Sequence, residues 1–254
     1  MLALHPKMGW LSQFSMRDGS VKGRRRTWAA NAYDYFLRKI FSHTWKKQTG
    51  LADTLFVPTP SESYVFFEQV FSSFGNGPIS MASKEFLRNQ ILSEASRQKK
   101  KFFIIKQPKF HRYLTVFQEL FPNLQVIHTV RDGRAVVASI FKKKHPNSAR
   151  QSDCLTSFPN ILDYWKEPIK NITKFKKNGG PLAVEIKYEE FCQDTHGHIR
   201  ATLEKLSLEV DLFPFEKIPP FLPNTNIDSL SRLNPGCLSS IQAGLESELK
   251  QYGY

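Results

Sequence analysis

The chain has 254 residues, of which 41% are hydrophobic, and its 36 Lys and Arg against 23 Asp and Glu give a net charge of +13. This length and apolar content fit one large globular domain over residues 1–254 and exclude a disordered chain. The excess of positive charge favours an anionic partner, such as a nucleotide, an acidic glycan, a nucleic acid or a membrane surface, without choosing among them.

Cysteine content and hydropathy indicate the compartment. The chain has three cysteines, Cys154, Cys192 and Cys237. Because this number is small and odd, a disulfide framework is not expected. No apolar run approaches the ~18 residues that a membrane-spanning helix needs. The first residues, MLALHPKMGW, do not have the basic and apolar regions of a secretory signal. We therefore predict no transmembrane segment and a cytoplasmic location.

Helices dominate the first hundred residues of the predicted order, and strands alternate with helices after them. Apolar residues at helical spacing predict helices over residues 28–42, from Ser61 onward and over 83–97. Strands are predicted over 102–106, 124–130 and 182–187, and helices over 110–120, 132–143, 157–177 and 196–206, with a short helix directly after the last strand. The segment 208–237, which has five prolines, is predicted to be irregular, and an amphipathic helix over 238–251 comes after it.

The alternation of apolar strands with helices predicts an α/β fold in three layers, with a parallel sheet flanked by helices. Ligands of such sheets bind at the carboxyl ends of the strands. The residues at these ends are Lys106, Arg131 and Tyr188, of which two are cationic. The sequence therefore predicts an anion-binding site at one edge of the sheet.

The stretch VIHTVRDGRAVVASIF places Arg131 between a strand and a helix. Asp132 is suited to cap this helix, and a helix N-terminus beside a guanidinium attracts phosphate. At 100° per residue, Ser139 lies within about 20° of Asp132 on the helix surface, and Lys143 lies on the same face. One alternative needs no ligand: Asp132 caps, Arg131 pairs with a carboxylate, and Ser139 is a small packing residue.

This stretch resembles the 3′-phosphate-binding segment of sulfotransferases that use 3′-phosphoadenosine 5′-phosphosulfate. The arginine after an apolar strand and the serine eight residues later have the spacing of that family. FFIIKQPKFHRYLTVFQELFP looks like the family's strand ending in Lys-x-Pro, and LAVEIKYEEFCQD resembles its strand ending in Tyr-Glu-Asp. ESELKQYGY is similar to the Leu-x-x-x-Gly-Tyr ending of many bacterial members. The resemblance is good over about 101–254 and loose over 28–100.

The resemblance implies a sulfotransferase with a P-loop NTPase-like fold, which transfers a sulfuryl group to a hydroxyl or amine acceptor, such as a carbohydrate or a small molecule. Arg131 and Ser139 would bind the 3′-phosphate of the donor nucleotide, and Tyr188 would lie near its adenine. Lys106 is the candidate for stabilising the leaving phosphate oxygen, because sulfuryl transfer depends on cations at the charge that develops. His111 is a candidate base, with Glu62 as an alternative.

One part of the family pattern is not found: the first strand and the Arg-Ser-Gly-Thr-like loop that binds the 5′-phosphosulfate. LALHPKMGWLSQF looks like the family's segment directly after that loop, so we expect the chain to begin there, as a truncated sequence or as a natural protein that has lost the loop. GSVKGRRRTW is the only substitute, and it has no preceding strand. We therefore expect the 3′-phosphate half of the donor site to be better preserved than the transfer chemistry.

Two other function classes remain open. The chain is alternatively a non-catalytic relative or fragment that binds a nucleotide or polyanion, or a basic protein that binds glycan or nucleic acid. Nucleic acid is the less favoured ligand, because no nucleic-acid-binding motif accompanies the basic runs. Cys192, His196 and His198 have a ligand-like spacing, but no second pair completes a tetrahedral site, so we predict no metal.

Overall fold

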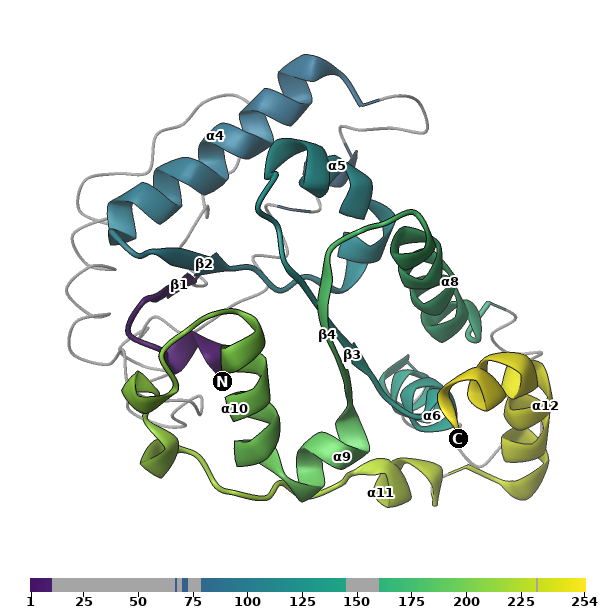
Figure 1. The fold of residues 1–254 in the computed structure, drawn as a ribbon. Helices are drawn as coiled ribbons and strands as arrows, with labels where there is room; N and C mark the ends of the chain where they lie inside the picture. Colours follow the sequence, from purple (N-terminus) through teal and green to yellow (C-terminus); the bar gives the residue numbers. More distant parts are fainter. Residues whose placement is uncertain (11–66, 68–69, 73–78, 145–159, 232) are drawn as a thin grey trace. The chain divides into compact units, whose positions relative to one another are not determined.

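The computed structural model describes residues 1–10, 67, 70–72, 79–144, 160–231 and 233–254 (Figure 1). The predicted helix over 28–42, Glu62 and the segment GSVKGRRRTW lie outside these residues. The chain divides into two compact units: Met1–Phe110 with Glu119–Pro122 and Glu209–Pro219, and His111–Gln118 with Asn123–Leu208 and Pro220–Tyr254. That residues 1–254 form one domain stays a prediction.

The helices and strands have the predicted order from residue 81 onward. The strands are β1 (Met8–Trp10), β2 (Phe102–Ile104), β3 (Val126–Val130) and β4 (Leu182–Lys187). The α-helices are α4 (Met81–Gln98), α5 (Leu114–Leu120), α6 (Gly133–Lys144), α8 (Asp163–Lys177), α9 (Tyr188–Gln193), α10 (Thr195–Lys205), α11 (Asn226–Leu230) and α12 (Pro235–Tyr252). Short 3₁₀ helices are η1 (Leu2–Leu4), η2 (Pro108–Arg112), η3 (Val210–Leu212) and η4 (Phe215–Lys217).

The strands confirm an α/β fold with parallel pairing and helices around the strands. β1 pairs with β2 and β3 pairs with β4, both in parallel. Within the described residues these are two separate two-stranded sheets rather than the one sheet that the alternation predicts. The resulting sheets are small, and helices make up most of the regular structure.

The sequence pattern does not predict strand β1, since the first strand that it indicates is 102–106. The three residues of β1, Met-Gly-Trp, are too few to show an alternating pattern. Tertiary contacts form this strand: the Trp10 N–H donates to Oε1 of Gln98 at 3.1 Å, and Nε2 of Gln98 donates back to the Trp10 carbonyl at 2.9 Å. The amide side chain of Gln98 thus bonds the backbone of β1 as a neighbouring strand would.

Several boundaries differ from the prediction for local reasons. β2 ends at Ile104, so Lys106 comes two residues after the strand instead of ending it. The range 110–120, predicted as one helix, contains the end of the 3₁₀ helix η2 followed by α5. Pro108 is the first residue of η2. The proline-rich segment contains η3, η4 and α11. Helix α12 begins at Pro235, earlier than predicted, because Oδ1 of Asn234 accepts from the Cys237 N–H at 2.8 Å.

The core of the second unit joins β3 to helices α6, α8 and α12. Its fully or almost fully buried side chains are Val130, Val137, Phe141, Ile161, Trp165, Ile169, Cys237, Ile241, Leu245, Leu249 and Tyr252. Helix α10, with Ile199 and Leu203 buried, contacts β4, and Figure 1 shows α10 and α8 on opposite sides of the β3–β4 pair. Helices therefore flank the β3–β4 pair on both sides.

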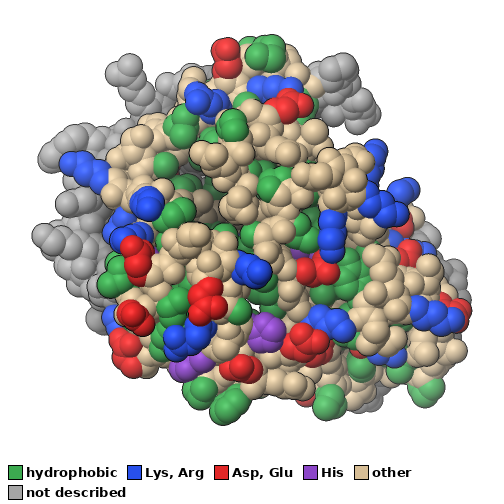
Figure 2. Space-filling model, in the orientation of Figure 1, with side chains coloured by type: hydrophobic (Ala, Val, Ile, Leu, Met, Phe, Trp, Pro, Cys, Tyr) green, Lys and Arg blue, Asp and Glu red, His purple; other side chains and the backbone are tan. Residues whose placement is uncertain are grey.

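The surface charge, the hydropathy of the helices and the cysteines can each be compared with the predictions from the sequence. On the face in Figure 2, Lys and Arg side chains are interspersed with Asp and Glu, so the positive charge does not form one patch there. In the described part of the chain, no helix is both long enough and apolar enough to cross a membrane. Cys192 is free and buried, whereas Cys237 is disulfide-bonded, which the small number of cysteines does not predict.

The contact between Gly133 and Trp165 gives a stability prediction. A Cβ at Gly133 would lie 2.5 Å from ring atoms of Trp165, which is only 5% exposed. Since the ring has no room to move, we expect Gly133→Ala to destabilise the protein by about 1–3 kcal/mol in chemical denaturation.

Gly244→Ala is the matched control. Its Cβ would meet mainly the end of the flexible Leu162 side chain, and alanine favours the helix by about 0.5–1 kcal/mol. Equal losses of stability in the two variants would contradict a specific role for the close approach of Trp165 to Gly133.

Candidate functional site

Arg131 lies directly after β3 and is held by neutral groups. Its Nε donates to Oδ1 of Asn226 at 2.7 Å, and its Nη2 donates to the Thr225 hydroxyl at 3.1 Å. The guanidinium lies over the Tyr188 ring, 4.7 Å from the centroid. Arg131 makes no ion pair with any carboxylate in the described ranges, so the alternative in which it pairs with a carboxylate finds no support. Its positive charge is not neutralised by these partners.

The guanidinium keeps hydrogen-bonding capacity for a ligand. It has five N–H groups, of which Asn226 and Thr225 take one on Nε and one on Nη2. Among the described residues, the edge formed by Nη1 and the second N–H of Nη2 has no hydrogen-bond partner. Such an edge donates two parallel hydrogen bonds to a phosphate or carboxylate. The arrangement can therefore bind an anion end-on without displacing either neighbour.

Asp132 precedes helix α6 and caps it, as predicted. Its carboxylate and its own N–H are both hydrogen-bonded there. Oδ1 of Asp132 accepts from the Arg134 N–H at 2.9 Å, which is the capping bond. Its carboxylate also pairs with the Arg134 guanidinium, with Nη2 2.8 Å from Oδ2. The Asp132 N–H donates to Oε1 of Glu189 at 3.0 Å. Two N–H groups at this helix start, those of Asp132 and Arg134, are therefore already bonded to carboxylates.

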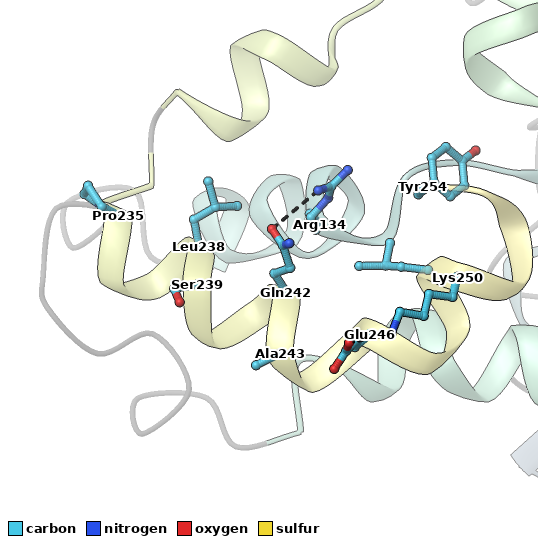
Figure 3. A pocket seen from close by; sticks show the side chains of 10 residues that line it. Arg134, Pro235, Leu238, Ser239, Gln242, Ala243, Glu246, Lys250 and Tyr254 are labelled. Carbon is cyan, nitrogen blue, oxygen red and sulfur yellow. Dashed lines mark hydrogen bonds and ion pairs between the residues drawn. The ribbon is translucent and has the colours of Figure 1, made fainter.

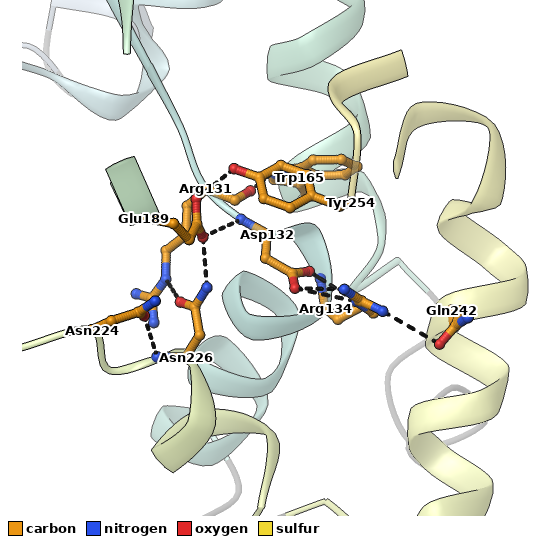
Figure 4. A network of polar contacts seen from close by, with 9 residues as sticks. All are labelled: Arg131, Asp132, Arg134, Trp165, Glu189, Asn224, Asn226, Gln242 and Tyr254. Atoms are coloured by element: carbon orange, nitrogen blue, oxygen red, sulfur yellow. Dashed lines mark hydrogen bonds and ion pairs between the residues drawn. The ribbon is translucent and has the colours of Figure 1, made fainter. Parts of the chain in front are cut away.

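Glu189 is the centre of the polar network in Figure 4, although the sequence pattern does not single it out. Its Oε1 accepts from the Asp132 N–H and, at 2.5 Å, from Nδ2 of Asn226, while its Oε2 accepts from the Tyr254 hydroxyl at 2.6 Å. Burial alone would raise the pKa of Glu189, but these hydrogen bonds outweigh burial and lower it. Burial and the bond to Glu189 raise the pKa of Tyr254, which stays a donor.

The structure brings Tyr188 to Arg131 but shows no hydrogen bond between Arg131 and Ser139, both of which it describes. Tyr188 is the first residue of α9, and its hydroxyl lies 3.3 Å from that of Thr225 and 3.4 Å from the Pro223 carbonyl. Ser139 is partly exposed on α6, two turns after the cap. The side chain of Lys143, expected on the same face, lies outside the described residues.

Lys106 belongs to the first unit, whereas the other predicted site residues belong to the second. It is exposed and comes shortly after β2. The next residue, Gln107, is only 5% exposed, and its Oε1 accepts from the Lys109 N–H at 2.6 Å. Nε2 of Gln107 is buried without a hydrogen-bond partner in the described structure. An unpaired buried donor is uncommon in folded proteins.

His111 lies in η2 and contacts helix α8. Its Nδ1 is 3.0 Å from Nδ2 of Asn171, and since an amide nitrogen only donates, Nδ1 is the acceptor. The proton of the neutral ring is then on Nε2. Burial first, and the positive charge of Arg112 after it, lower the pKa of His111 against the opposing effect of Glu167. His111 is therefore neutral near pH 7, but its basic nitrogen is engaged with Asn171.

A pocket of about 550 Å³ lies beside the network, between the start of α6 and helix α12 (Figure 3). Arg134 reaches into it and lies 3.5 Å from Oε1 of Gln242, and Glu246, Lys250 and Tyr254 line it further along. None of the predicted site residues lines this pocket. Tyr254 connects the two places, because its hydroxyl bonds Glu189 while its ring faces the pocket.

The sequence carries weak signals for the residues that the predicted site leaves out. Glu189 belongs to the YEE element at the end of β4, of which the prediction uses only the tyrosine. Thr225 and Asn226 belong to PNTN, a polar cluster in the segment predicted to be irregular. As for the metal alternative, the described residues contain no group of three or more His, Cys, Asp or Glu side chains placed to hold an ion.

Comparison with known proteins adds one finding. A family model described as the sulfotransferase family matches residues 1–212 of the chain. The matched range includes every predicted site residue and Glu189, and it ends before Thr225, Asn226 and Tyr254. No curated protein and no solved structure matches the chain significantly.

The lowered pKa of Glu189 predicts a specific pH dependence of stability. A carboxyl whose pKa is lower in the folded state than its ordinary value of 4.5 stabilises the fold above that value. The stabilisation is lost as the pH falls through the lowered pKa. We expect Glu189→Gln to be less stable than wild type at pH 7 and the gap in melting temperature to shrink below about pH 4.5.

Glu190→Gln is the control for this measurement. Glu190 is exposed on the same helix, 3.9 Å from the ammonium of Lys187, and it is not part of the network in Figure 4. A gap for Glu189→Gln that is constant from about pH 3 to pH 7 would contradict the role of its carboxylate.

Proposed function

Since the chain belongs to the sulfotransferase family, we propose that it transfers a sulfuryl group from 3′-phosphoadenosine 5′-phosphosulfate to a hydroxyl or amine of an acceptor, a carbohydrate or a small molecule. The observation that carries the proposal is the guanidinium of Arg131. It comes directly after a parallel strand, meets no carboxylate among the described residues, and keeps N–H groups on two nitrogens for an anion. A site of this kind suits the 3′-phosphate that distinguishes this donor from other adenine nucleotides.

In the proposed donor site, three side chains have separate roles. The Nη1–Nη2 edge of Arg131 binds the 3′-phosphate, and the Ser139 hydroxyl donates a further hydrogen bond to it. Tyr188 lies next to the adenine, which suits an aromatic ring after the adjacent strand. The contact between Tyr188 and Arg131 supports this assignment, because it places the aromatic ring next to the residue that would bind the phosphate.

The proposed reaction is an in-line displacement at sulfur. The acceptor oxygen or nitrogen forms a bond to sulfur as the bond from sulfur to the 5′-phosphate oxygen breaks, and a base takes the acceptor proton. Lys106 stabilises the charge that develops on the leaving phosphate oxygen. His111 is the proposed base, and it serves in this role only after Asn171 releases Nδ1 or turns its amide.

The proposed location remains the cytoplasm, where this donor would be met in solution together with a small acceptor. One finding counts against it: Cys237 is disulfide-bonded, and disulfides persist mainly in oxidising compartments. Subcellular fractionation of the expressed protein decides between the cytoplasm and an oxidising compartment.

Binding of adenosine 3′,5′-bisphosphate tests the donor site. We expect the wild-type chain to bind this nucleotide and Arg131→Ala to weaken binding by about 10- to 100-fold, because a charge-assisted hydrogen bond contributes about 1.5–3 kcal/mol. Isothermal titration calorimetry measures the effect. Arg112→Ala is the control, since Arg112 is exposed and paired with Glu167 in the same unit. No binding by wild type, or equal losses in both variants, would refute the proposed site.

Steady-state kinetics with the donor labelled in its sulfuryl group test the transfer step. We expect Lys106→Ala to lower kcat by about a hundredfold, as for other losses of transition-state charge stabilisation, and to leave the affinity for adenosine 3′,5′-bisphosphate within about threefold. Lys101→Ala is the control, because Lys101 is an exposed lysine at the other end of the same strand. Nucleotide binding without any transfer to hydroxyl or amine acceptors would instead identify a non-catalytic relative.

A further inference from the structure

Arg131, the residue proposed to bind the phosphate, is oriented by a residue that does not contact its side chain. We propose that Glu189 is the positioning residue of this site: its carboxylate orients the amide of Asn226, and this amide orients the guanidinium of Arg131 toward the 3′-phosphate. The inference rests on the proposed function, because it assigns a role within the same donor site.

The hydrogen bonds through Asn226 have a fixed direction. Nδ2 of Asn226 donates to Oε1 of Glu189 at 2.5 Å, so the opposite atom, Oδ1, must face Arg131, where it accepts from Nε at 2.7 Å. A carboxylate can only accept, and it therefore allows one orientation of the amide. A glutamine in place of Glu189 would accept or donate, and a turned Asn226 would present its NH₂ group to a guanidinium that has no acceptor.

Burial keeps the Asn226 side chain in this orientation. Asn226 is 7% exposed and begins helix α11, with its own N–H donating to Oδ1 of Asn224 at 3.0 Å. Both ends of the side chain are therefore bonded, and the backbone is held by a local turn. A buried amide with all of these partners has little freedom, so the orientation set at Glu189 is passed on to Arg131.

The backbone of Arg131 is fixed by the same carboxylate. Oε1 of Glu189 accepts from the N–H of Asp132, the next residue, at 3.0 Å. The Arg131 carbonyl accepts from Nε1 of Trp165 at 2.9 Å. Glu189 thus fixes the chain just after Arg131 and, through Asn226, the far end of its side chain. One carboxylate sets both the position and the direction of the guanidinium (Figure 4).

The neutral amide between the two charges keeps the positive charge available. A carboxylate in direct contact with Arg131 would neutralise the guanidinium and compete with a phosphate for it. Asn226 is a neutral spacer between them, and the carboxylate is satisfied by three donors, including the Tyr254 hydroxyl at 2.6 Å. The arrangement therefore uses a carboxylate for rigidity while the charge of Arg131 stays available to the ligand.

The test compares two nucleotides that differ only in the 3′-phosphate. Calorimetric titration with adenosine 3′,5′-bisphosphate and with adenosine 5′-monophosphate gives a selectivity ratio for each variant. We expect Glu189→Gln to weaken binding of the bisphosphate by about tenfold and to change binding of the monophosphate by less than about twofold, because only the 3′-phosphate contacts Arg131. A general loss of structure would weaken both nucleotides equally and leave the ratio unchanged, which would overturn the positioning role.

Three further variants complete the test. Asn226→Ala removes the spacer and leaves Glu189 bonded to Asp132, so it should lower the selectivity ratio, by no more than Glu189→Gln does. The double variant should lose less than the product of the two single losses, because both changes act on the guanidinium through Asn226. Glu190→Gln, the exposed neighbour, should keep the wild-type ratio.

The outcomes separate this inference from the proposed function. If wild type does not prefer the bisphosphate, or Arg131→Ala keeps that preference, the proposed donor site is wrong. If Arg131→Ala abolishes the preference but Glu189→Gln and Asn226→Ala retain it, Arg131 binds the phosphate without the help of Glu189. Fully additive losses in the double variant would likewise overturn the action of Glu189 through Asn226.

Discussion

The carboxylate of Glu189 is the interaction on which the candidate site depends. It joins parts of the chain that are far apart in sequence: the residue after Arg131, the residue that begins α11, and the tyrosine after α12. A partly buried carboxylate is stable only when donors surround it, and here three groups provide them. The site is therefore a junction at the carboxyl ends of β3 and β4, and its geometry depends on satisfying one negative charge.

The packing around the junction gives it rigidity. Trp165 fills the space over Gly133, where no side chain would fit, and its indole N–H bonds the Arg131 carbonyl. The same ring belongs to the core that joins β3 to helices α6, α8 and α12. The apolar core and the polar network thus meet at one side chain. A ligand group on Arg131 would be held by a strand end that cannot shift without disturbing that core.

Charge is distributed within the site so that one cation stays available. Asp132 pairs with Arg134 and caps helix α6, whereas the partners of Arg131 in the described part of the chain are neutral. Two arginines of the same short segment therefore have different surroundings: Arg134 pairs with the carboxylate at the helix start, and Arg131 is bonded to neutral side chains. Isolated surface ion pairs contribute little, but a buried cap bonded on both sides fixes the local backbone. The proposed donor, an anionic nucleotide, would suit a guanidinium with these neutral partners.

The sequence alone determined the α/β class, most element boundaries after residue 80, the cap at Asp132 and the place of Arg131 and Tyr188 at strand ends. These features depend on local patterns of apolar residues, capping and turn residues, which a single sequence displays. Only the tertiary structure decided that Glu189, Asn226 and Tyr254 meet, that Glu189 accepts from the start of α6, and that Met8–Trp10 is a strand. Each of these depends on a partner that is distant in the sequence, and no local pattern announces which distant donor will satisfy a given buried acceptor.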